Sequence, residues 1–293
     1  MDSTKKTIVS ELATSRSGSL ALALYRNTAH LIDISKRCRV GSINVLWDTG
    51  GDRAAVDEAA RFCVTAAYTA NTVTAYTLPS GEPMWRRTDL RKVQHTILDE
   101  RRAACIVIPE KGAAVVLDPH TGETVQTLWS LEDLFSSRDH DLSLVDDNKR
   151  AFRLMDDCTW NELHKLDRGA ALLDACFSPT AVFTSESGGP LRAFALDDGK
   201  ELWRIYLEHH HYLRICFCEE LSLLCAVRWY YVKSPAVMHL HLIDCETGAI
   251  HTEYKVSDHG QAIAFVQSGA ALLTQQQMLV DTRTGTMSEI LMT

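Results

Sequence analysis

The sequence predicts an all-β protein built from one hairpin unit that is repeated along the chain. The clearest copy spans residues 115–129, where an apolar strand ending at Leu117 is followed by a turn from Asp118 to Gly122 and then by a second, alternating strand. Asp accepts hydrogen bonds from nearby backbone N–H groups, and Gly adopts the positive φ that a tight turn requires. The order Asp-x-x-Thr-Gly recurs at 244–248 and 281–285, and shortened copies lie at 78–85 and 196–203.

The spacing of the turn glycines predicts how many units there are. Gly81 and Gly122 are 41 residues apart, Gly122 and Gly199 are 77 apart (two units), and the next intervals, to Gly248 and to Gly285, are 49 and 37. A period near forty with four short strands per unit is typical of a β-propeller blade. We therefore predict a single β-propeller of seven four-stranded blades, at about 7–45, 46–90, 91–129, 130–167, 168–207, 208–257 and 258–293. Six or eight blades are also compatible, because unit four is irregular and unit one lacks its turn glycine.

Each unit has its own pattern of predicted strands. Alternating or continuous apolar runs predict strands at 8–12, 19–25, 29–34 and 37–43, then at 61–68, 72–78 and 82–86, and then at 93–98 and 103–108 before the 115–129 hairpin. Helical periodicity is found only at 54–60, a segment too short to alter the class.

The fourth unit diverges, but it aligns with the fifth. The fourth unit contains Arg-Ala-Phe at 150–152 followed by Asp-Asp at 156–157, and the fifth contains the same order at 192–194 and 197–198, about one period later. The predicted outer strand of the fourth unit is 160–166. The remaining predicted strands of units five to seven lie at 181–184, 191–196, 201–207, 213–218, 221–229, 238–244, 249–256, 262–266, 270–274, 278–281 and 286–292.

Two propeller-repeat families resemble these units. The Asp-x-x-Thr-Gly turn and the run from Asp198 to Trp203 (Asp-Gly-Lys-Glu-Leu-Trp) resemble the quinoprotein (PQQ-like) repeat, whose outer strand often carries Trp soon after the Gly. Residues 8–33, with Ser17-Gly18 between two strands, resemble a WD repeat. The quinoprotein resemblance would imply larger, exported, usually eight-bladed dehydrogenases that hold the quinone beneath a disulfide between adjacent cysteines, with calcium nearby. This sequence has no Cys-Cys pair. A quinone-dependent dehydrogenase is therefore not expected, and neither is a cofactor.

Charge and cysteine usage bear on partner and location. The net charge of −8 argues against a nucleic-acid surface and favours a basic protein as partner. No apolar stretch has the length of a signal peptide or of a membrane span, so we expect no membrane association. Nine cysteines, an odd number spread over the chain, indicate reduced thiols and a cytoplasmic location. Cys63 and Cys105 lie inside predicted strands, where Cys serves as a small apolar filler.

Motifs for catalysis or metal binding are weak. Asp48-Thr49-Gly50 matches the core of an aspartic-protease signature, but that chemistry needs a second carboxylate, and no second Asp-Thr-Gly occurs. His209-His210-His211 with His239 and His241 could suggest zinc, but the spacings are not those of a standard zinc site. No phosphate-binding Gly-rich loop, Gly-x-Ser-x-Gly or His-Glu-x-x-His is present. We therefore assign no catalytic residue and no metal ligand.

Unusual segments in predicted loops favour protein binding. Loops carry function on rigid scaffolds, and aromatic residues beside a cation are common anchors of interfaces. The predicted partner-binding residues, all on one face, are His209, His210, His211, Trp229, Tyr230, Tyr231 and Lys233. A secondary candidate is an acidic loop expected on the same face, with Glu132, Asp133, Asp139 and Asp141.

The sequence thus favours a non-catalytic, cytosolic protein-binding propeller. Such a protein could be a scaffold, a regulator or a dedicated inhibitor, including a toxin-neutralising immunity protein. The alternative is a propeller hydrolase or lyase whose dispersed active site lies in the central channel.

Overall fold

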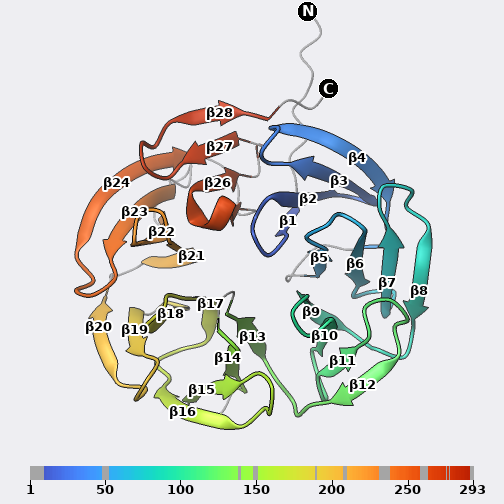
Figure 1. The fold of residues 1–293 in the computed structure, drawn as a ribbon, viewed down its shortest axis with the longest axis horizontal. Helices are drawn as coiled ribbons and strands as arrows, with labels where there is room; N and C mark the ends of the chain where they lie inside the picture. The colour runs from blue at the N-terminus through green and yellow to red at the C-terminus, as the bar shows by residue number, and fades with distance from the viewer. Residues whose placement is uncertain are drawn as a thin grey trace, which may run out of the picture.

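Twenty-eight strands form seven four-stranded antiparallel sheets, arranged as blades around a ring (Figure 1). This computed structural model describes residues 10–47, 53–137, 140–147, 151–188, 190–206, 210–230, 238–257, 263–274, 276 and 278–290. Within each blade the first strand lies nearest the centre and the fourth lies outermost (Figure 1). The predicted all-β propeller of seven blades is confirmed.

Every blade is one contiguous segment of chain, with four strands in sequence order. Their bounds are β1 (Glu11–Thr14), β2 (Leu20–Tyr25), β3 (Thr28–Asp33), β4 (Cys38–Asn44), β5 (Ala54–Val56), β6 (Phe62–Ala67), β7 (Thr72–Thr77), β8 (Pro83–Arg87), β9 (Val93–Asp99), β10 (Ala104–Pro109), β11 (Val115–Leu117), β12 (Thr124–Thr127), β13 (Asp133–Ser136), β14 (Leu142–Asp146), β15 (Ala151–Asp156), β16 (Glu162–Asp167), β17 (Leu172–Phe177), β18 (Ala181–Glu186), β19 (Leu191–Ala195), β20 (Glu201–Ile205), β21 (His210–Cys218), β22 (Leu223–Tyr230), β23 (Met238–Asp244), β24 (Ile250–Ser257), β25 (Ile263–Val266), β26 (Ala271–Thr274), β27 (Met278–Asp281) and β28 (Met287–Glu289).

The segment with helical periodicity at 54–60 does not form a helix. It begins with strand β5, whose three residues are all buried, and Ala54 pairs with Thr65 of β6. Strand pairing next to the ring centre therefore overrides a weak local preference for helix. Among the described residues the one helical element is a 3-10 turn, Gln267–Gly269.

The turn between the third and fourth strands has a left-handed residue in all seven blades. Five of these residues are glycines, with φ between 68° and 75°: Gly81, Gly122, Gly199, Gly248 and Gly285. Blades one and four use Arg37 and Trp160 instead, with φ of 53° and 56°. The two units without the turn glycine therefore keep the same turn with a residue that adopts this conformation less readily.

The predicted role of the turn aspartates is also confirmed. Asp118 Oδ1 accepts hydrogen bonds from the backbone N–H groups of His120 and Thr121, at 2.8 and 2.9 Å. Asp244 Oδ1 does the same for Glu246 and Thr247, at 3.1 and 2.7 Å. These bonds hold the pKa of the Asp118 carboxyl below its usual value.

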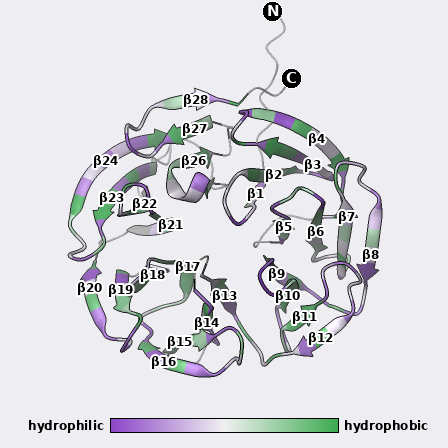
Figure 2. Cartoon of the chain, in the orientation of Figure 1, coloured by the Kyte–Doolittle hydropathy of each residue, from purple (hydrophilic) through white to green (hydrophobic). Residues whose placement is uncertain are grey.

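The hydrophobic core lies between neighbouring blades. The seven apolar clusters are formed mainly by the inner three strands, and the outer strands are mixed or polar (Figure 2). Because a blade cannot cover both faces of its sheet, stacking around the ring supplies the core. None of the nine cysteines forms a disulfide, and burial raises the pKa of the Cys63 and Cys105 thiols to about 12. These two residues are buried fillers, as predicted.

The ring closes between blades seven and one. Leu12, Ala21 and Ile32 pack against Val266 and Leu273 in a shared cluster. Two backbone hydrogen bonds join the same blades: Gln267 N–H to the Gly18 carbonyl at 3.1 Å, and Ser268 N–H to the Ser17 carbonyl at 3.0 Å.

Candidate functional site

Blade six has the longest inner hairpin among the described strands. β21 has nine residues and β22 has eight, whereas the first strands of the other blades have three to seven and the second strands four to six. The hairpin opens on the rim where the first strand of each blade begins and the second strand ends, which we call the loop rim. The opposite rim, which carries the turns between first and second strands, is the turn rim.

The open end of this hairpin brings predicted partner-binding residues together. The register pairs His210 with Tyr230 and His211 with Trp229. The expectation that these four residues lie in loops is wrong: they belong to β21 and β22, because the two segments pair with one another and Trp and Tyr favour strands. Trp229 also pairs with Met238 of β23. His209, Tyr231 and Lys233 lie outside the described residues.

One exposed aromatic residue at this rim is not among the partner-binding residues predicted from the sequence. Tyr206 directly follows β20 and is 65% exposed. It stands where the chain leaves blade five for blade six, so it belongs to the loop rim. The sequence pattern predicts a strand at 201–207 that would include it, but β20 ends at Ile205. An aromatic residue just before a polar loop was the available signal.

A chain of polar side chains lies within blade six. The Tyr212 hydroxyl is 2.9 Å from His241 Nδ1, and His241 Nε2 is 3.6 Å from Glu253 Oε1, which also pairs with His239. Burial is the main cause that lowers the pKa of His241, to about 4, so its imidazole is neutral at pH 7. Within the described ranges no group of three or more His, Cys, Asp and Glu side chains is placed to hold a metal.

The secondary acidic candidate does not form one surface. Glu132 and Asp133 lie at the loop-rim end of β13, whereas Asp141 lies in the turn before β14, on the turn rim. The expectation that these acids open on one face is therefore corrected, because β13 separates them. Glu132 pairs with Arg168 at 3.2 Å and Asp141 with Arg101 at 3.1 Å. Asp139 lies outside the described residues.

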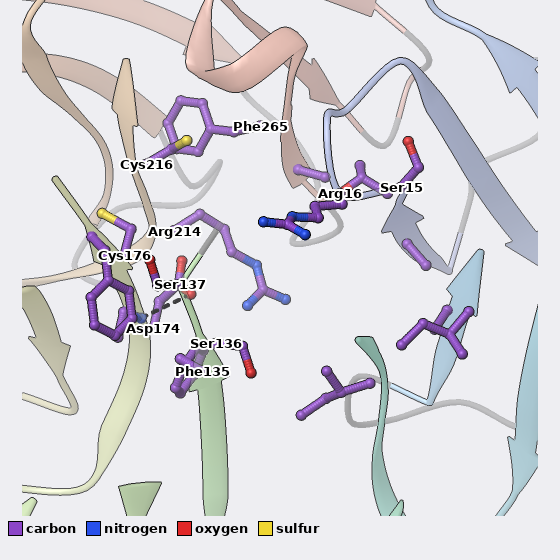
Figure 3. A pocket seen from close by; sticks show the side chains of 18 of the residues that line it. Ser15, Arg16, Phe135, Ser136, Ser137, Asp174, Cys176, Arg214, Cys216 and Phe265 are labelled. Carbon is purple, nitrogen blue, oxygen red and sulfur yellow. Dashed lines mark hydrogen bonds between the residues drawn. The ribbon is translucent and has the colours of Figure 1, made fainter. Parts of the chain in front are cut away.

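A central cavity of about 550 Å³ is lined by the first strands of all seven blades. Figure 3 shows two guanidinium groups, those of Arg16 and Arg214, that point into its open centre. Arg16 lies in the turn between β1 and β2, and Arg214 lies within β21. No sequence motif singled out these two arginines, because only closure of the ring brings blades one and six to a shared centre.

Comparison with solved structures supports the fold alone. The chain is similar to KlHsv2 with loop 6CD replaced by a Gly-Ser linker, with a TM-score of 0.71 and 9% identity over 92% of this chain and 91% of that one. It is also similar to the computationally designed Ika8 protein, with a TM-score of 0.61 and 12% identity over 96% and 95%. No family model matches the sequence, and no curated protein does. The protein is thus a seven-bladed β-propeller, and neither the PQQ-like nor the WD-repeat family is shown for it.

Proposed function

We propose that this chain is a non-catalytic protein-binding propeller that recognises its partner at the loop rim of blade six. The observation that carries the proposal is the extended pairing of β21 with β22, which holds His210 opposite Tyr230 and His211 opposite Trp229. Paired strands present residues with less conformational freedom than a loop does, so less entropy is lost on binding. Aromatic residues contribute large apolar area with few rotatable bonds.

The exposed Tyr206 side chain extends this surface toward blade five. The net charge of −8 favours a basic protein as the partner, through faster and more selective association. The role is that of a scaffold, a regulator or a dedicated inhibitor, of which a toxin-neutralising immunity protein is one form. Nine cysteines without a disulfide support a cytosolic location. Among the described residues, no helix has the length and apolar character needed to cross a bilayer.

The test begins with affinity purification of the tagged full chain and mass spectrometry, to find a partner present in stoichiometric amount. The variant Tyr230→Ala with Tyr231→Ala is then compared with wild type for affinity and for melting temperature. We expect a loss of about 2 kcal/mol or more in binding, about 30-fold, with little change in melting temperature.

The matched control is His251→Ala, whose side chain is 55% exposed on the outer strand β24. It should bind like wild type. If a well-folded double variant binds with unchanged affinity, the interface lies elsewhere. If no stoichiometric partner is recovered, the protein-binding role itself is in question.

A further inference from the structure

Two arginine side chains reach the central cavity of this acidic protein. Arg16 and Arg214 come from blades one and six, and both guanidinium groups point into the same cavity (Figure 3). Arg16 is half-buried, and its guanidinium has no hydrogen-bond or ion-pair partner within the described part of the chain. A partly desolvated cation of this kind is stabilised when an anion enters beside it.

Acidic side chains on the cavity wall are already engaged by other groups. Glu11 accepts hydrogen bonds from Trp47 Nε1 at 3.1 Å and from the Arg53 backbone N–H at 2.9 Å. Asp174 accepts the backbone N–H groups of Ile215 and Ala175, at 2.7 and 3.0 Å.

Asp133 accepts the backbone N–H of Leu134 at 2.8 Å, and Glu219 is the one acid of the wall without a side-chain partner among the described residues. Asp99 accepts a hydrogen bond of 2.6 Å from Arg102 Nε, and Glu100 accepts the backbone N–H of Glu58. Glu11, Glu100 and Asp174 join neighbouring blades through these bonds, and Asp99 bonds within its own blade. All four have donors other than Arg16.

The rest of the wall is mixed: it carries hydroxyl and imidazole side chains and an apolar part. Phe135, Phe265, Cys176 and Cys216 line one side of the cavity (Figure 3). A volume of about 550 Å³ is within the range of small-molecule pockets, and it is far larger than a simple inorganic anion needs. The cavity thus places two guanidinium groups beside an apolar part of its wall.

We propose that the central cavity binds a small organic anion. Its phosphate or carboxylate group lies between the guanidinium groups of Arg16 and Arg214, and its aromatic or aliphatic body packs against Phe135 and Phe265. Guanidinium groups recognise both kinds of oxyanion through paired N–H donors, which supplies orientation as well as attraction. This site is separate from the loop rim of blade six, so either one can exist without the other.

Isothermal titration calorimetry with four probes tests the proposal on the full chain. The probes are phenyl phosphate, benzoate, phenol and inorganic phosphate. We expect phenyl phosphate or benzoate to bind, phenol to bind about tenfold or more weakly than the better of the two, and rising salt to weaken the binding. The ratio of the affinities for phenyl phosphate and benzoate identifies the preferred oxyanion. Comparison of phenyl phosphate with inorganic phosphate shows how much the apolar body adds to the affinity.

Arg16→Gln is the decisive variant, because the Arg16 guanidinium makes no hydrogen bond or ion pair in the described residues. It should weaken binding about tenfold or more, whereas Arg16→Lys, which keeps the charge, should retain part of the affinity. Arg26→Gln is the matched control: Arg26 is an exposed arginine of the same blade, outside the cavity wall, and its removal should change nothing. Failure of both organic anions to bind at millimolar concentration overturns the proposal. Equal binding of phenol, or unchanged binding by Arg16→Gln, overturns it as well.

Discussion

The indole N–H of Trp203, in the outer strand of blade five, donates a 2.7 Å hydrogen bond to the Cys245 carbonyl in the turn of blade six. The same indole ring packs on Gly248, where a Cβ atom would lie 2.9 Å from it. Two other blade pairs repeat this arrangement, with Trp85 donating to the Pro119 carbonyl at 2.8 Å and Tyr254 to the Arg283 carbonyl at 2.6 Å. In these three blade pairs, an aromatic residue of one blade thus donates a hydrogen bond to the turn between the third and fourth strands of the next blade.

Gly248→Ala should destabilise the fold by about 2 kcal/mol or more. The φ of 73° is unfavourable for alanine, and the new methyl group would press on the Trp203 ring. In a Trp203→Ala background the ring is absent, so the same substitution should cost only about 1 kcal/mol, from the backbone term alone. Urea unfolding of the four proteins in this cycle measures both values. Equal costs in the two backgrounds would show that the ring contact contributes nothing.

Gly18→Ala should weaken closure of the ring. A Cβ atom at Gly18 would lie 2.5 Å from Gln267 N and 2.7 Å from Val266 Cα, both backbone atoms of blade seven. Backbone cannot move aside as a flexible side chain does, so we expect a loss of about 2 kcal/mol or more in the free energy of unfolding.

Gly188→Ala is the control for ring closure. Gly188 has a similar φ of 60°, but nothing lies within 4 Å of a Cβ placed there. It should cost about 1 kcal/mol through backbone conformation alone. If Gly18→Ala and Gly188→Ala have the same free energy of unfolding, the close approach of the blade-seven backbone to Gly18 does not limit closure of the ring.

His241 should make the fold less stable as pH falls through mild acid. Its folded pKa of about 4 lies below the unfolded value near 6.5, so between these values the unfolded chain binds more protons and stability drops with decreasing pH. The groups that face His241 are Tyr212, Glu253, His239 and Arg228. Between pH 7.5 and 5.5 we expect His241→Gln to lose about 1 kcal/mol less than wild type, measured by urea unfolding. Equal losses in both proteins would mean that His241 does not control this pH window.

The sequence by itself determined the repeating unit and predicted seven copies of it, with six or eight still compatible. Turn chemistry is local: an aspartate carboxylate bonds to N–H groups two and three residues away, and glycine supplies positive φ within the same turn. Most strand positions could be predicted as well, because the alternation of apolar and polar residues along a strand is also a local pattern. Blades one and four were harder to place, because Arg37 and Trp160 adopt the left-handed conformation without the glycine that announces it.

Only the tertiary structure decided which residues meet. β5 is a strand because β6 pairs with it beside the ring centre. Pairing between β21 and β22 likewise extends both strands as far as His210, His211, Trp229 and Tyr230. Arg16 and Arg214 are 198 positions apart, and no local pattern links them. They share a cavity because the ring closes between Gly18 and Gln267, and that closure depends on packing between blades.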